Sequence, residues 1–130
     1  MDCVVSDCNF SFAALKATRE CVLNIPTAEL VPKVVGCGNA SDRHKDRFMA
    51  FGVTPVPGTL VTAPLIAECF ANLGFRVADT RLMNRYNFSV LEVLKAWIDP
   101  AVRDSRTLHH RGHGPFMIAG ETIKLPSKMK

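Results

Sequence analysis

Short apolar runs, separated by polar turns and caps, make up the first half of the chain. Residues 3–5 form a brief apolar run of the kind found at the end of a strand. Residues 21–25 include β-branched residues and stop at a proline, which predicts a buried strand that ends before a turn. Between the two runs, Asn9 or Ser11 is placed to cap a helix that reaches about Thr18.

Two further short helices are expected before the middle of the chain. Thr27 is placed to cap the first of them, where Pro32 is tolerated only near the start and glycines mark the end. Ser41 or Asp42 is placed to cap the second, which carries two phenylalanines on a common side before Gly52. The first half therefore mixes short helices with strands.

Long extended segments dominate the second half, after the turn-forming residues 54–58. We expect extended segments over residues 65–79 and 86–97, the second with apolar side chains on both faces. Such strands fit a barrel with a filled interior and an outer apolar patch that a second subunit covers. Residues 116–119 and 122–125 are expected to form a terminal hairpin. The predicted fold class is mainly β with short helices.

The composition is that of one globular domain, residues 1–130, with 48% hydrophobic residues against 22% charged ones. The net charge of +4 is spread along the chain rather than concentrated in one basic stripe, so no nucleic-acid partner is expected. The densest basic group is Arg43, His44, Lys45 and Arg47, interrupted by acidic residues. That arrangement favours one small anion, such as a phosphate, over a polymer.

Cysteine usage and hydropathy bear on the compartment. The five cysteines form no CxxC pair, and an odd number fits poorly with a closed disulfide framework. Reduced thiols in a cytoplasmic protein are therefore expected. No apolar run has the roughly 18 residues that a membrane span needs, and no signal-peptide pattern is found, so no membrane partner is expected.

Four sequence motifs occur in a fixed order: ECVLNIP (20–26), SDRHKDRF (41–48), TPVP (54–57) and APLIAE (63–68). A glycine-rich string, GHGPF (112–116), follows them near the C-terminus. Together they resemble the flavin reductase-like, FMN-binding split-barrel family, in its flavoredoxin branch. The resemblance implies a split β-barrel, an FMN cofactor held at the barrel edge near a homodimer interface, and NAD(P)H or an electron-transfer protein as electron donor.

The resemblance also implies which residues contact FMN. Asn9, Phe10 and Ser11 match a turn whose hydroxyl and backbone groups contact the flavin, although Ser11 fits a plain helix cap as well. Arg47 matches a family lysine that reaches the cofactor, and its planar guanidinium suits a phosphate. The alternative for Arg47 is a solvated charge paired with a neighbouring aspartate.

Two later aromatic residues complete the predicted FMN site. Tyr86 stands where many family members have a histidine, and it cannot shuttle a proton near neutral pH. Its alternative role is a strand residue packed in the barrel. Phe116 matches a family aromatic near the ring system, and its alternative is an ordinary hairpin core residue.

The chain departs from the family at its start, where relatives carry roughly forty more residues with barrel strands that contact the flavin. The resemblance therefore implies a split barrel that is truncated at its N-terminus. We expect a chain of this kind to hold FMN loosely or not at all, because part of the contacts is absent. The alternatives are that a partner subunit supplies the missing contacts or that the protein is a remnant with weak FMN binding.

The sequence gives less support to a metal site or to a cysteine nucleophile. His109, His110 and His113 with Cys37 or Cys69 match no usual zinc spacing, so no metal is predicted. Cys37 with His44 as its base lacks an orienting third group. A flavin performs hydride chemistry itself, so no acid–base pair need appear in the sequence, and the catalytic residues stay unknown. A non-catalytic flavin binder or electron carrier on the same fold stays open.

Overall fold

The computed structural model describes residues 1–40, 46–103, 105–121 and 126. A four-stranded antiparallel sheet in the order β1-β6-β5-β2 forms its centre, and two small two-stranded sheets, β3-β4 and β7-β8, flank it. Short helices fill the connections. The elements are β1 (Asp2–Val4), α1 (Phe10–Thr18), β2 (Glu20–Ile25), the 3-10 helix η1 (Ala28–Leu30), α2 (Val31–Asn39), α3 (Arg47–Phe51), β3 (Pro55–Val56), β4 (Leu65–Ile66), β5 (Ala71–Asp79), α4 (Met83–Tyr86), β6 (Phe88–Ile98), β7 (Leu108–His110) and β8 (Phe116–Ile118).

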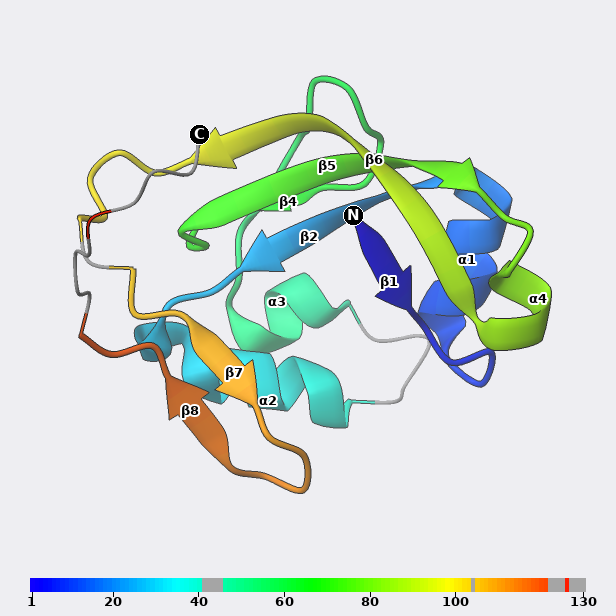
Figure 1. Ribbon diagram of the computed structural model, residues 1–130. Coiled ribbons are helices and arrows are strands. Elements are labelled where there is room, and N and C mark those ends of the chain that lie inside the picture. The colour runs from blue at the N-terminus through cyan, green and yellow to red at the C-terminus, as the bar shows by residue number, and fades with distance from the viewer. Residues whose placement is uncertain (41–45, 104, 122–125, 127–130) are drawn as a thin grey trace.

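The central sheet curls into part of a barrel, with β1 and β2 at its two ends (Figure 1). Two register irregularities in the β5–β6 pairing, between Gly74 and Phe75 and between Val77 and Asp79, bend these long strands. α1 and α4 lie together at one end of the sheet, and Lys16 of α1 donates a 2.9 Å hydrogen bond to Asn84 of α4. α2 and α3 lie on the other side, near β2 (Figure 1).

The main core lies where α1 and α4 pack against the sheet. Phe75 is fully buried, and Leu15 of α1 and Met83 of α4 cover it together with Val77 and Leu91. Apolar side chains spaced three apart on α1 reach this core, because Phe12 packs against the same cluster as Leu15. The predicted helix that Asn9 begins and the predicted strand before Pro26 are both confirmed.

Several predicted helix caps differ from the structure. The helix before Gly52 begins at Arg47, and Asp46 caps it by accepting hydrogen bonds from Phe48 N at 2.9 Å and Met49 N at 3.3 Å. The predicted caps Ser41 and Asp42 lie outside the described residues. Thr27 precedes η1, but its side chain makes no capping bond there.

Two predicted extended segments were too long. Residues 65–79 divide into β4 and β5 around a turn at 67–70. The second strand starts only at Phe88, because Asn87 adopts a left-handed conformation (φ 56°) that ends the helical turn α4. Tyr86 is therefore a helical residue with 56% exposure, and its predicted place in a barrel strand was wrong.

The terminal hairpin is also formed by other strands than expected. β8 pairs with β7, with Leu108 opposite Ile118, across a loop in which Gly112, His113 and Gly114 all have positive φ. The expected partner strand, residues 122–125, lies outside the described residues. The polar segment before β8 thus supplies a strand, since left-handed residues reverse the chain there.

Candidate functional site

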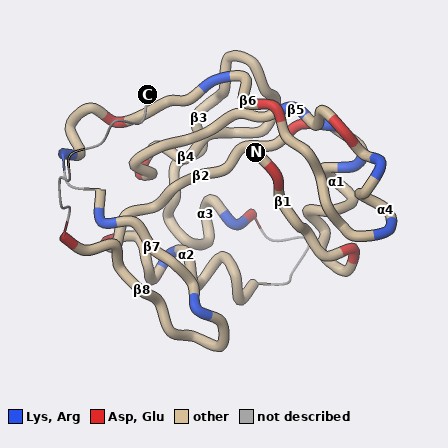
Figure 2. Tube along the Cα trace, viewed as in Figure 1, with Lys and Arg blue, Asp and Glu red and all other residues tan. Residues whose placement is uncertain are grey.

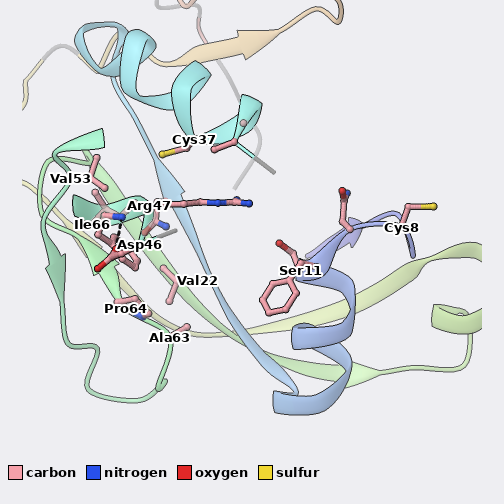
Figure 3. A pocket seen from close by; sticks show the side chains of 16 residues that line it. Cys8, Ser11, Val22, Cys37, Asp46, Arg47, Val53, Ala63, Pro64 and Ile66 are labelled. Atoms are coloured by element: carbon pink, nitrogen blue, oxygen red, sulfur yellow. Dashed lines mark hydrogen bonds between the residues drawn. The ribbon is translucent and has the colours of Figure 1, made fainter. Parts of the chain in front are cut away.

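A cavity of about 920 Å³ lies between the first turn of α1, the outer side of β2, the end of α2, α3 and the turn before β4. Figure 3 shows side chains from all these elements around it. Its volume falls within the roughly 300–1,000 Å³ that is usual for ligand and cofactor sites. The lining is largely apolar, with Val22, Phe48 and Ile66 among its members, and a few polar groups point into it.

The first turn of α1 forms one wall of the cavity. Asn9 is the N-cap residue by backbone conformation (φ −84°, ψ 140°), but its side chain makes no capping hydrogen bond. Ser11 lies one residue inside the helix, and its side chain borders the cavity (Figure 3). The positive end of the helix dipole and a hydroxyl thus face the same space, which favours an anionic or electron-rich ligand.

Arg47 supplies the basic group of this cavity among the described residues. Its side chain extends from α3 across the cavity toward the α1 wall (Figure 3). The neighbouring carboxylate of Asp46 caps α3 and makes no ion pair with Arg47. Within the described part of the chain the guanidinium has no hydrogen-bond or ion-pair partner.

Asn24 adds a polar group that the sequence analysis did not select. It lies on β2 and lines the cavity, and its buried Oδ1 accepts no hydrogen bond from any residue that the structure describes. A buried acceptor without a donor is costly unless a ligand or water satisfies it. The one signal in the sequence was an amide between two apolar residues, Leu23 and Ile25.

The structure brings together four of the six residues predicted to contact FMN. Asn9, Phe10, Ser11 and Arg47 all line the cavity, although they come from different elements. Tyr86 and Phe116 do not line it.

Each of these two aromatic residues has another environment. Tyr86 lies beside Arg85, whose guanidinium is 5.2 Å from the ring centroid. Phe116 packs against His110 in the β7–β8 hairpin, with ring centroids 4.8 Å apart.

Two glutamates hold the loops that form the cavity wall near β4. The hydroxyl and backbone N–H of Thr62 both donate to Glu20, and these bonds lower the pKa of the Glu20 carboxyl. The backbone N–H of Thr54 and, to a smaller extent, its hydroxyl donate to Glu68, and these bonds lower the pKa of the Glu68 carboxyl. Both carboxylates accept hydrogen bonds in their charged form, which fixes the loops at neutral pH.

Charged residues of both signs are distributed over the described part of the fold (Figure 2). The three ion pairs found there are all on the surface, at Arg76–Glu92, Arg81–Asp79 and Arg106–Glu29. The described residues contain no group of three His, Cys, Asp or Glu side chains that could hold a metal ion. None of the helices in the described ranges is long and apolar enough to cross a membrane. His44 and most of the basic group at 43–47 lie outside those ranges.

Comparison with known proteins identifies the relatives of this chain. The model of the family described as "Flavin reductase like domain" matches residues 3–116. The FMN-dependent NADH:quinone oxidoreductase 2 of Xanthomonas euvesicatoria pv. vesicatoria (strain 85-10) is 34% identical over 85 residues, which are 59% of this chain and 38% of that protein. The chain thus spans well under half the length of this relative.

Solved structures agree on the fold. The flavoredoxin of Desulfovibrio vulgaris (Miyazaki F) superposes with a TM-score of 0.84 at 17% identity, over 95% of this chain and 72% of the other. The flavoredoxin of Methanosarcina acetivorans gives a TM-score of 0.82 at 21% identity, over 98% and 72% of the two chains. The mainly β half-barrel with few short helices is the architecture that the sequence predicted.

Proposed function

Because the chain belongs to the flavin reductase-like domain family, we propose that its cavity binds FMN and that electrons from NAD(P)H or a redox protein pass through the bound flavin. One observation supports this most directly. The guanidinium of Arg47 and the buried Oδ1 of Asn24, neither of which has a partner among the described residues, line the same cavity. A ligand that presents both an anion and a hydrogen-bond donor would satisfy both groups, and FMN has a phosphate and a ring N–H.

The residues of the cavity fit FMN in chemical type. Arg47 and Ser11 would hold the phosphate, because a guanidinium and a hydroxyl are both suited to phosphate oxygens. Asn24 would accept a hydrogen bond from the ring. The apolar side chains of Val22, Phe48 and Ile66 would pack against the ring and exclude water.

Bound FMN would supply the acceptance and release of a hydride or of single electrons, and the protein would bind, orient and shield it. This division of roles accounts for a cavity without an acid–base pair among its lining residues. The name of the Xanthomonas relative specifies FMN, NADH and a quinone. For this chain we propose that NAD(P)H reduces the bound flavin. The alternative function is that of an electron carrier that binds flavin without oxidising NAD(P)H.

The test has two stages. Titration of the purified protein into FMN, followed by flavin fluorescence, is expected to show saturable binding. Consumption of NAD(P)H in the presence of FMN and an electron acceptor then separates a reductase from a carrier, which binds flavin without oxidising the nucleotide. Absence of any saturable binding would contradict the proposal.

A homodimer is also proposed, from the exposed apolar residues of the central sheet. Leu23, Val93 and Ile98 lie on the same face of the central sheet as Phe75. The strand register places them there, because each is paired with a residue of β5 that points to that face. These three side chains are 37%, 50% and 60% exposed. An apolar face of this kind is typical of a surface that another subunit covers.

A further inference from the structure

We propose that Glu68 is a positioning residue that sets the place of Arg47 relative to Asn24, and so the distance between the two polar groups of the cavity. The inference rests on the proposed function insofar as it concerns FMN. Glu68 belongs to the APLIAE motif, but it does not line the cavity itself. Its effect would be indirect, through the segment that follows α3.

The first step is the bond between Glu68 and Thr54. The backbone N–H of Thr54 lies 3.1 and 3.0 Å from the two carboxylate oxygens, and the hydroxyl donates to Oε1 at 2.8 Å. The backbone carbonyl of Thr54 in turn accepts from Ala67 N at 3.0 Å. Thr54 is therefore held on its donor and acceptor sides by two consecutive residues, one of them charged.

The second step leads from Thr54 to α3. Val53 N donates to Phe48 O at 3.0 Å, and Gly52 N donates to Met49 O at 3.3 Å, so the segment before Thr54 is bonded to the helix. Lys33 of α2 donates to the carbonyl of Gly52 and also attracts the Glu68 carboxylate. The C-terminal end of α3 is thus held by groups from α2 and from the β4 side.

The third step leads from Glu68 to the sheet. Glu68 follows β4 closely, and Asn72 of β5 fixes β4 by accepting from Ile66 N at 2.9 Å and donating to Ile66 O at 3.1 Å. Asn72 lies opposite Asn24 in the β2–β5 register. Hydrogen bonds, joined by short stretches of backbone, therefore connect the strand pair that carries Asn24 with the helix that carries Arg47.

A second contact also holds α3, but it joins the helix to α2 rather than to the sheet. Phe51 packs so closely on Gly36 that a Cβ at Gly36 would lie 2.6 Å from its ring. That contact fixes α3 to α2, whereas Glu68 fixes it to the sheet. With five residues, α3 is too short to be stable in isolation, so its orientation depends on such contacts. Loss of the Glu68 carboxylate would leave α3 attached to α2 but held to the sheet only through the Ala67–Thr54 bond and the β3–β4 pairing, so α3 could shift relative to Asn24.

The experiment compares Glu68→Ala with Glu68→Gln, and uses Glu92→Ala as control, since Glu92 is a surface carboxylate paired with Arg76 on the central sheet. Affinities for FMN and for riboflavin, which lacks the phosphate, are measured for each variant. Glu68→Ala is expected to weaken FMN binding about tenfold, as for a lost charged hydrogen bond, and to leave riboflavin affinity within about twofold. Glu68→Gln, which keeps one acceptor, is expected to fall between Glu68→Ala and the wild type.

Combination with Arg47→Ala tests the route of the effect. If Glu68 acts through Arg47, the double variant binds FMN no more weakly than Arg47→Ala alone. A loss of riboflavin affinity equal to that of FMN, or additive losses in the double variant, would overturn the proposal, because either result indicates general destabilisation or a separate role.

Hydrogen exchange of the amides from Arg47 to Val53 gives a measurement that does not need a flavin. Glu68→Ala is expected to speed exchange in this segment, and Glu92→Ala is not. Unchanged exchange in Glu68→Ala would overturn the positioning role even if FMN binds. Accelerated exchange together with a wild-type protein that binds neither flavin would instead uphold the anchoring of α3 and reject the proposed function.

Discussion

Asn24 and Asn72 stand directly opposite each other on β2 and β5, yet they have opposite hydrogen-bonding situations. Asn72 is 7% exposed and bonds to both the N–H and the carbonyl of Ile66. The Oδ1 of Asn24 is buried and has no hydrogen-bond partner in the described part of the chain. The same side chain in neighbouring positions therefore serves the fold in one strand and faces the cavity in the other.

Substitution of the two asparagines should separate stability from binding. Asn72→Ala is expected to lower the free energy of unfolding by about 2 kcal/mol, because two backbone groups of Ile66 lose their partners. Asn24→Val is expected to leave stability unchanged or raise it by up to about 1 kcal/mol, since an unsatisfied acceptor is removed. Urea denaturation of both variants measures this.

Asn24→Val, which should not lower stability, is nevertheless expected to lower the affinity for flavin. Asn24→Val is expected to weaken FMN binding about fivefold to tenfold, the usual effect of one lost hydrogen bond of about 1 kcal/mol or slightly more. If Asn24→Val binds FMN as the wild type does, the amide does not contact the ligand.

Charge reversal at Arg47 tests the phosphate contact. Arg47→Glu is expected to weaken FMN binding at least tenfold, because a charged hydrogen bond contributes roughly 1.5–3 kcal/mol and the new carboxylate repels the phosphate. Arg85→Glu is the matched control, since Arg85 lies on α4 and not on the cavity. Equal dissociation constants for Arg47→Glu and the wild type would show that Arg47 is a surface charge only.

Two glycines of α2 provide a matched pair for the packing of α3. Gly36→Ala would place a Cβ 2.6 Å from the ring of Phe51, and we expect it to destabilise the protein by about 1–3 kcal/mol. Gly38→Ala meets nothing within 4 Å and is expected to stabilise by up to about 1 kcal/mol, because alanine favours a helix. Thermal denaturation of the two variants distinguishes them, and equal melting temperatures would contradict close packing at Gly36.

The labelling rates of the buried cysteines should depend on pH, because burial raises the pKa of their thiols. Burial raises the pKa of Cys21 and of Cys69 to about 11, since a thiolate is poorly solvated inside the protein. At pH 8 a thiol with that pKa has about one hundredth of the thiolate of one with a pKa of 9.0. Exposed Cys8 is therefore expected to react first with iodoacetamide.

Peptide mapping by mass spectrometry after short labelling times follows each cysteine. Cys21 and Cys69 should become as reactive as Cys8 in denaturant, and their rates in the folded protein should rise as pH increases from 7 to 9. Rapid labelling of Cys21 in the folded protein at pH 7 would contradict its place against the core.

Light scattering tests the homodimer. A dimer mass is expected at micromolar concentration, with an interface of about 1,200 Å² or more in total. Val93→Glu is expected to shift the protein toward the monomer, since it places a charge on the exposed apolar face. A monomer mass for the wild type across this concentration range would count against the dimer.

Local signals in the sequence determined several elements. The apolar run before Pro26 formed β2, and Asn9 began α1, because strand propensity and helix starts depend on neighbouring residues. The motifs also indicated the family, and they contained Arg47. For Tyr86, local pattern misled: alternation predicted a strand, whereas burial of Met83 and the left-handed Asn87 produced a helical turn.

Only the tertiary structure decided which polar groups face the cavity. Asn24 and Asn72 have the same side chain in neighbouring strands, and the sequence holds no sign that β4 would reach one and leave the other without a partner. Glu68 and Thr54 are likewise 14 residues apart and meet only after β3 and β4 pair. The hydrogen-bonding state of a buried polar atom depends on what packs over it, and that is a property of the folded chain.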